Sequence, residues 1–123
     1  MKNLLKFTLL ISFLSQSSIA QKYNHNLISK ESEINFEKTH NRGIEKNNII
    51  YYVENDLQTV SAYKNDKLIW KTNVISVCGK PKVGRPEIRY IGYNKDKLLV
   101  VLGKHNFAEI DINNGKTKLV GSD

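Results

Sequence analysis

The sequence predicts an all-β protein, an antiparallel meander of two blade-like four-stranded units that form a small sheet or sandwich after a cleaved signal peptide. From residue 48 onward, short runs of β-branched and aromatic residues alternate with turn residues such as Asn, Asp and Gly. No segment beyond residue 20 shows sustained helical periodicity. Two stretches, Ile49–Trp70 and Leu98–Val120, have the same order of strands and turns, which indicates an internal repeat.

Residues 1–20 have the three-part layout of a secretory signal peptide. Lys2 and Lys6 give a positive start, an apolar stretch follows, and the small residues Ser18 and Ala20 stand at the −3 and −1 positions of a cleavage site. The apolar stretch is shorter than the about 20 residues that a membrane-spanning helix needs. We therefore expect cleavage after Ala20, no transmembrane segment in the mature chain, and an exported protein that is periplasmic or extracellular. The alternative is an uncleaved anchor.

The mature chain has the size of one domain. Residues 21–47 are polar and are expected to be a lead-in that is partly disordered or forms an edge strand, and residues 48–123 are expected to form the β domain. The mature chain holds 17 Lys and Arg against 12 Asp and Glu, a net charge of +5. Because these charges are spread along the chain and form no dense basic stripe, we expect an acidic protein as partner and no nucleic acid.

Each strand is predicted from its own pattern of apolar residues. In the lead-in, Ile34 and Phe36 alternate with polar residues, which favours one short edge strand. Further strands are expected at Ile49–Val53, Leu57–Lys64, Lys67–Val77, Glu87–Tyr93, Lys97–Leu102, Ala108–Ile112 and Lys116–Val120. Lys67–Val77 can bend near Asn73 into a further strand, so seven to nine strands are expected in all. Lys97–Leu102 is apolar throughout after its lysine, which predicts a central strand covered on both faces.

Tight turns are expected where Asn, Asp and Gly separate these strands. Asn65-Asp66 predicts a hairpin between two of them, and Asn113-Asn114-Gly115 predicts the last turn, because Asn and Gly tolerate a positive φ.

The repeated stretches lie about 48 residues apart, which is the spacing of one four-stranded propeller blade. Glu109–Lys116 matches the middle of the pattern Ala-Leu-Asp-x-x-Thr-Gly-x-x-x-Trp, and Ser61–Thr72 matches its ends. On these residues the chain resembles the repeats of pyrroloquinoline-quinone type β-propellers. A closed propeller needs at least about four blades, so the resemblance implies an open sheet, a small sandwich or an oligomer. The quinone-binding residues of that family have no matching positions here, so no cofactor is implied.

A basic loop is the strongest candidate for a binding site. Gly79–Pro86 contains the spacing Gly-x-x-x-x-Gly, but Arg85-Pro86 follows where a phosphate-binding loop has Lys-Ser/Thr, which excludes a nucleotide site. Loops held by a rigid sheet often carry binding function, although a solvated connection is the alternative. The residues expected to contact an acidic partner are Lys80, Lys82, Arg85, Arg89, Tyr90 and Tyr93.

Catalytic arrangements are weakly indicated. No histidine stands at metal-ligand spacing from another histidine or a cysteine, so no metal and no cofactor are expected. His105 with Glu54 and Arg89 would supply the groups for acid–base ribonuclease chemistry. Cys78 is the single cysteine and forms no internal disulfide; it is expected to be a small buried hydrophobe, and a reactive thiol or an intermolecular bridge is the alternative.

These observations predict a non-catalytic exported protein-binding domain, for example a periplasmic inhibitor or immunity-type protein. Two alternatives stay open: a small secreted hydrolase such as a ribonuclease, and a truncated or assembling propeller-like structural unit that self-associates.

Overall fold

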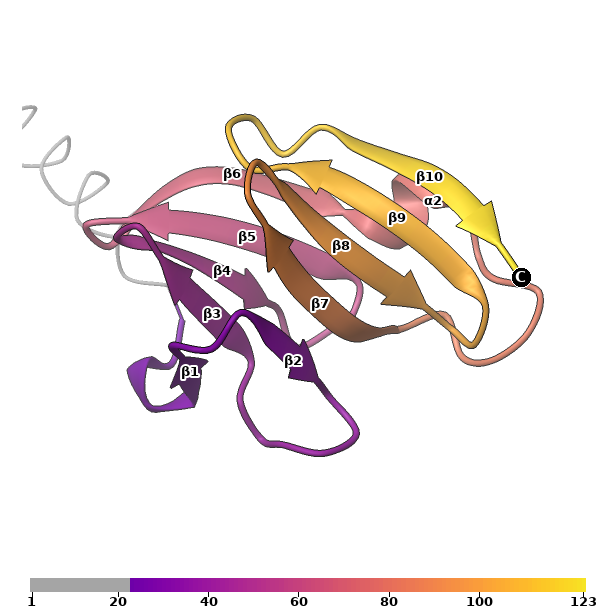
Figure 1. The fold of residues 1–123 in the computed structure, drawn as a ribbon, viewed down its shortest axis with the longest axis horizontal. Helices are drawn as coiled ribbons and strands as arrows, with labels where there is room; N and C mark the ends of the chain where they lie inside the picture. Colours follow the sequence, from indigo (N-terminus) through magenta and orange to yellow (C-terminus); the bar gives the residue numbers. More distant parts are fainter. Residues whose placement is uncertain (1–22) are drawn as a thin grey trace, which may run out of the picture.

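The computed structural model describes residues 23–123, so the expected signal peptide lies outside the described residues. These residues form a 3₁₀ turn, ten strands and one short α-helix, where seven to nine strands were expected (Figure 1). In chain order the elements are η1 (His25–Leu27), β1 (Ile28–Ser29), β2 (Glu33–Asn35), β3 (Gly43–Lys46), β4 (Ile49–Val53), β5 (Thr59–Lys64), β6 (Lys67–Asn73), α2 (Val74–Cys78), β7 (Ile88–Asn94), β8 (Lys97–Leu102), β9 (Asn106–Asp111) and β10 (Thr117–Ser122).

The strands form two five-stranded sheets. One has the order β1-β3-β4-β5-β6, which we call sheet A, and the other has the order β10-β9-β8-β7-β2, which we call sheet B. Each contains a four-stranded antiparallel meander, β3–β6 or β7–β10 (Figure 1). The lead-in adds β1 parallel to β3 and β2 antiparallel to β7. The predicted all-β arrangement of two four-stranded units is confirmed.

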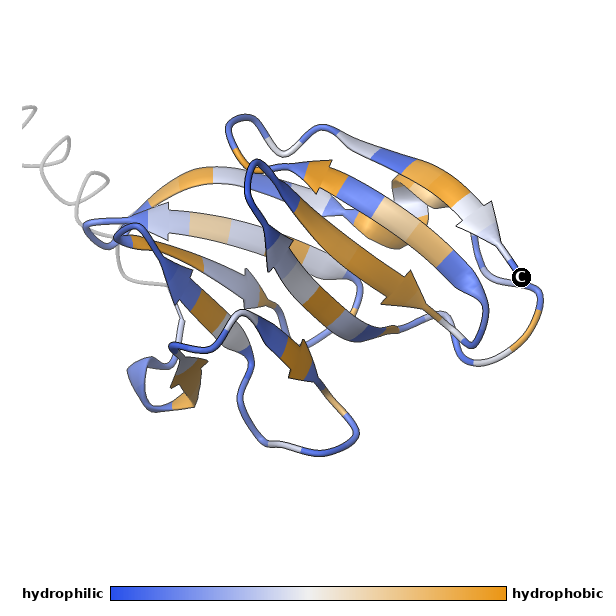
Figure 2. Ribbon diagram, viewed as in Figure 1, coloured by the Kyte–Doolittle hydropathy of each residue, from blue (hydrophilic) through white to orange (hydrophobic). Residues whose placement is uncertain are grey.

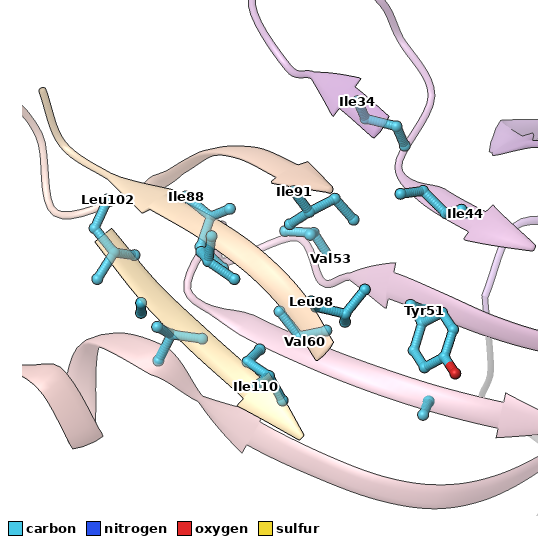
Figure 3. Packing of buried hydrophobic residues seen from close by; sticks show 14 of the residues in the cluster. Ile34, Ile44, Tyr51, Val53, Val60, Ile88, Ile91, Leu98, Leu102 and Ile110 are labelled. Atoms are coloured by element: carbon cyan, nitrogen blue, oxygen red, sulfur yellow. The ribbon is translucent and has the colours of Figure 1, made fainter. Parts of the chain in front are cut away.

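The core lies between the sheets and is built mainly from alternate residues of the inner strands. Figure 3 shows side chains of sheet A, such as Val53 and Val60, facing side chains of sheet B, such as Leu98 and Ile110. Hydrophobic and hydrophilic bands alternate along β9 (Figure 2), as expected for a strand with one buried face. In β8 the alternate residues Leu99 and Val101 are only half-buried, so the prediction that both faces of this strand are covered was wrong.

The prediction of a strand through Val77 was also wrong, because residues 74–78 form the helix α2. The Asn73 side chain accepts a hydrogen bond from the Ser76 N–H (2.9 Å) and caps the start of the helix. Gly79, at φ +86°, ends it and donates its N–H to the Ile75 carbonyl. Five residues are too few to show helical periodicity, and their β-branched side chains favour a strand locally.

Trp70 joins the two sheets. This residue of β6 is 8% exposed, and its indole Nε1 donates a hydrogen bond to the Ile112 carbonyl (2.8 Å) in the connection between β9 and β10. A Cβ added at Gly115 of the same connection would lie 2.6 Å from the Trp70 ring, so only glycine fits there. The predicted Asn113-Asn114-Gly115 turn thus closes the last hairpin and also seats the largest side chain of sheet A.

The hairpin turns have the backbone that their residues predict. Asn65 and Asp66 have φ of +51° and +64°, and Asn47 and Asn48 have φ of +52° and +65°. Two successive positive φ values are typical of type I′ turns, whose twist matches that of the strands they connect.

We expect the protein to lose stability as the pH rises from about 10 to 12. Burial raises the pKa of Tyr51 to about 12. For Tyr90, burial is the larger cause and the hydrogen bond to the Glu33 carboxylate the smaller one, and together they raise the pKa to about 12. Because both values exceed the ordinary value of 10.0, folding favours the neutral phenol. The contribution of these two tyrosines to the free energy of unfolding is complete below about pH 10. It is lost as the pH rises through their folded-state pKa of about 12.

Urea unfolding at a series of alkaline pH values, with phenolate absorbance recorded in parallel, checks this expectation. The variant Tyr90→Phe should show a smaller alkaline loss of unfolding free energy than the unchanged protein. Titration of all tyrosines near pH 10 in the folded protein would contradict it.

Candidate functional site

A pocket of about 450 Å³ opens at one end of the sandwich, where connections of both sheets meet. Its lining comes from the β2–β3 connection, the β4–β5 turn, the loop before β7 and the β8–β9 turn. Phe36, Leu57 and Ile88 give it apolar walls, and four basic and two acidic side chains surround them. An apolar concave site with a few convergent charged groups is the usual form of a binding site.

Arg42 is fixed to the pocket wall by backbone carbonyls. Its Nη2 donates hydrogen bonds to the carbonyls of Val53 (2.8 Å) and Glu54. The guanidinium carbon lies 5.6 Å from the centre of the Phe36 ring, within the range of a cation–π contact. The Nε atom is buried and has no hydrogen-bond partner among the described residues. The side chain is therefore held in one orientation, with no acidic partner in the described part of the chain.

Arg89 is fixed in a similar way on the opposite sheet. The pairing of β7 with β8 shifts register between Ile88 and Tyr90, which places Arg89 in a β-bulge. Its Nε donates to the Gly103 carbonyl and its Nη2 donates to the Lys104 carbonyl (2.8 Å). A guanidinium has five N–H donors, so each of these two arginines keeps further donors for a ligand.

The basic side chains of the pocket have no ion-pair partner among the residues that the structure describes. They are Arg42, Arg85, Arg89 and Lys104, and the acidic side chains at the same pocket are Glu37 and Glu87. In residues 23–123 none of these six groups takes part in an ion pair. The pocket therefore keeps an excess of positive charge and suits a carboxylate, which guanidinium groups bind through paired hydrogen bonds.

The loop between α2 and β7 is packed on the β8–β9 turn. The Gly103 N–H donates to the Glu87 carbonyl (3.0 Å), and the Lys104 N–H donates to the Val83 carbonyl (3.2 Å). The backbones approach so closely that a Cβ at Gly103 would lie 2.6 Å from the Val83 oxygen. The position of Arg85 is therefore set by the turn that also supplies Lys104.

The structure brings together two of the six predicted contact residues. Arg85 and Arg89 line the pocket, whereas Lys80 and Lys82 line a neighbouring hollow of about 410 Å³ on the other side of the same loop. The basic loop therefore lies between two hollows, with Arg85 in one and Lys80 and Lys82 in the other.

The two predicted tyrosines lie outside both hollows. The Tyr90 hydroxyl donates to the Glu33 carboxylate (2.7 Å) and ties β7 to β2. The Tyr93 ring packs against Tyr51 at 5.9 Å, and its hydroxyl accepts a hydrogen bond from the Asn47 side chain (3.0 Å). Both side chains make contacts within the protein. Neither lines the pocket that contains Arg42, Arg85 and Arg89, which we call the arginine pocket.

The residues suggested for ribonuclease chemistry do not share a pocket. His105 lies 3.0 Å from the Asp123 carboxylate and lines the hollow of Lys80 and Lys82, whereas Arg89 lines the arginine pocket. The Glu54 carboxylate accepts a hydrogen bond from the Tyr63 hydroxyl (3.3 Å).

Three further features would indicate other functions in the described part of the chain: a reactive thiol, a metal site and a membrane-spanning helix. Burial raises the pKa of the half-buried Cys78 thiol, which disfavours the reactive thiolate. Residues 23–123 contain no group of three or more His, Cys, Asp or Glu side chains that could hold a metal ion. None of the helices in this range has the length and apolar character needed to cross a membrane.

Comparison with protein-family models, curated proteins and solved structures finds no match to this chain. The candidate site therefore stands on its own geometry.

Proposed function

We propose that this protein is an exported, non-catalytic binding domain whose arginine pocket receives an acidic group on the surface of a protein partner. An inhibitor or immunity-type protein of the periplasm is one form of this function. The observation that carries the proposal is a pair of half-buried arginines, Arg42 and Arg89, each held by two backbone carbonyls and neither paired with a carboxylate of residues 23–123.

Fixed arginines favour binding for an entropic reason. A free arginine side chain loses rotamer freedom when it binds, at about 0.5–1.5 kcal/mol for each immobilised side chain. Arg42 and Arg89 have already been ordered by folding, so a carboxylate that reaches them meets donors in place. The apolar side chains of Phe36 and Leu57 beside them would shield a bound carboxylate from water, which strengthens a charged hydrogen bond.

The acidic side chains of the pocket favour a protein over a polyanion. Glu37 and Glu87 would repel the continuous negative charge of a nucleic acid backbone. Within a protein interface they can accept hydrogen bonds from the partner's backbone or side chains. A mixed polar rim around apolar walls is the usual composition of such an interface.

Charge reversal of the two exposed basic residues tests the proposal. Arg85 and Lys104 line the pocket and are exposed, and neither side chain forms a hydrogen bond or an ion pair within residues 23–123. We expect the double variant Arg85→Glu, Lys104→Glu to lose at least about tenfold in affinity for a partner captured from an extract of the source cells, because both cations would become repulsive. The measurement is an affinity pull-down with identification by mass spectrometry, followed by titration of the captured partner.

The matched control reverses two lysines at the other end of the strands. Lys64 and Lys67 flank the β5–β6 turn and are exposed (Figure 1). The variant Lys64→Glu, Lys67→Glu has the same net charge as the pocket variant and should bind as the unchanged protein does. Equal loss of affinity in both variants would show that net charge alone governs binding, and unchanged affinity in the pocket variant would place the contact elsewhere.

A further inference from the structure

The strand β10 is the outermost strand of sheet B, and its outer edge has no strand partner in residues 23–123. The Asp111 N–H donates to the Lys116 carbonyl (2.8 Å), and the register then pairs Lys118 with Glu109. Hydrogen-bonded and non-hydrogen-bonded pairs alternate along an antiparallel ladder. The backbone N–H and C=O groups of Thr117 and Leu119 therefore point away from β9.

The other sheet edges offer less. β1 has two residues and β2 has three, and such short edge strands are poor templates for another strand. The middle of β6 is packed by the β9–β10 connection, where Gly115 lies against the Trp70 ring. β10 is thus the edge of the described chain that best accommodates an added strand.

Exposed apolar side chains lie beside this edge. Leu119 is 45% exposed and Val120 is 48% exposed. The helix α2 packs along β10 and adds Val77, which is 55% exposed (Figure 1). The register shift between Leu119 and Gly121 makes Val120 the extra residue of a β-bulge, a feature that re-aims a side chain. An added strand would cover these side chains as well as the free backbone groups.

The charges around the edge are basic. Lys118 belongs to β10 itself, and Lys80 and Lys82 line the hollow that Leu119 also lines. None of the three forms an ion pair among the described residues, whereas Asp123 of the same hollow is paired with His105. A second copy of this basic chain would bring lysines together, and lipid headgroups cannot satisfy alternating backbone donors and acceptors. An extended acidic protein segment can pair with the backbone groups of the edge, cover the exposed apolar side chains and neutralise the lysines.

We propose that the free edge of β10 binds an extended, acidic protein segment as a sixth strand of sheet B. Because side chains alternate between the two faces of a strand, its apolar residues would cover Leu119 and Val77 on one face and its acidic residues would meet Lys118 on the other, while Lys80 and Lys82 add to the positive charge around the edge. This inference rests on the proposed function for the identity of the segment, which belongs to the same acidic partner. It adds a second contact, by strand addition, to the contact in the arginine pocket.

A synthetic peptide tests the edge without knowledge of the partner. The probe is acetyl-(Glu-Val)₃-amide, titrated into the ¹⁵N-labelled protein, with amide shifts and amide hydrogen exchange as readouts. We expect saturable shifts at Thr117 and Leu119 and exchange of these two amides slowed by at least about fivefold, because their N–H groups become hydrogen-bonded. A peptide of the same sequence with alternate backbone nitrogens methylated should not bind.

The controls separate charge from strand pairing. The variant Lys118→Glu should weaken binding severalfold, whereas Lys71→Glu in β6 should leave it unchanged. Equal binding of acetyl-(Lys-Val)₃-amide would overturn the acidic assignment. Binding of anionic phospholipid vesicles that displaces the peptide from β10 would point to a membrane surface instead, and shifts confined to other strands would overturn the site itself.

The peptide experiment can succeed even if the arginine pocket is not a binding site. If the variant Arg85→Glu, Lys104→Glu captured the partner as well as the unchanged protein does, the pocket proposal would fail. Peptide binding at β10 in the same variant would still support strand addition. Loss of capture in the pocket variant together with an unresponsive β10 would leave the proposed function standing and remove the strand addition.

Discussion

We expect replacement of Trp70 by alanine to lower the free energy of unfolding by about 3–5 kcal/mol, the cost of removing a large buried aromatic side chain. The indole belongs to β6 of sheet A but contacts the β9–β10 connection of sheet B through the Ile112 carbonyl and Gly115. Its loss removes apolar contact between the sheets and leaves the carbonyl without its donor. Urea unfolding followed by circular dichroism measures the change.

Two variants in the same strand separate the contributions of Trp70. Trp70→Phe keeps much of the apolar area but removes the hydrogen bond to Ile112, so a smaller loss is expected. Leu68→Ala removes a side chain that is 52% exposed and should cost about 1 kcal/mol or less. If Trp70→Ala were no more harmful than Leu68→Ala, the indole would not join the sheets.

We expect Gly103→Ala to lower the free energy of unfolding by about 2–5 kcal/mol. Gly103 has a φ of +58°, a conformation that costs a residue with a side chain about 1–2 kcal/mol. The added Cβ would lie 2.6 Å from the Val83 oxygen and 2.8 Å from a carbon of Pro81, and such overpacking costs about 1–3 kcal/mol. Because Arg89 donates to the Gly103 carbonyl, the arginine pocket should be disturbed as well.

Two other glycines serve as controls for Gly103. Gly79 has a φ of +86° and a ψ of 162°, a conformation that essentially only glycine adopts, but a Cβ there would meet no atom within 4 Å, so Gly79→Ala carries a backbone cost of about 1–3 kcal/mol without a clash. Gly121 has neither a positive φ nor a close neighbour, and Gly121→Ala should be nearly neutral. Equal stability of all three alanine variants would contradict the close packing of the loop on the β8–β9 turn.

The strands were predictable because their signals are local. The alternation of Ala108 and Ile110 with polar residues gives β9, and Asn65-Asp66 gives the turn between β5 and β6. The helix α2 was missed because Val74–Cys78 has the composition of a strand, and only its flanking Asn73 and Gly79 favour a helix. β3 was missed because Ile44 is its one strongly apolar residue, and the pairing with β4 comes from the tertiary fold.

The candidate site was half predictable for the same reason. Arg85 stands in the predicted basic loop, and Arg89 follows four residues later at the start of β7, so the sequence indicated both as candidates. Arg42 lies in the polar lead-in and Lys104 in a distant turn, so only the stacking of the two sheets brings them to the same pocket. Tyr93 points toward Tyr51 because of the face of β7 on which it lies. The pattern of aromatic residues in the sequence did not predict that face.

Binding of a carboxylate by the fixed arginines can be observed on their own side chains. The measurement is a titration of the protein with N-acetylglutamate, followed by the ¹⁵N–¹H resonances of the Arg42 and Arg89 side chains. We expect saturable shifts at these two arginines that weaken with added salt and vanish in the variant Arg85→Glu, Lys104→Glu. Shifts spread evenly over the surface lysines, with none at Arg42 or Arg89, would contradict it.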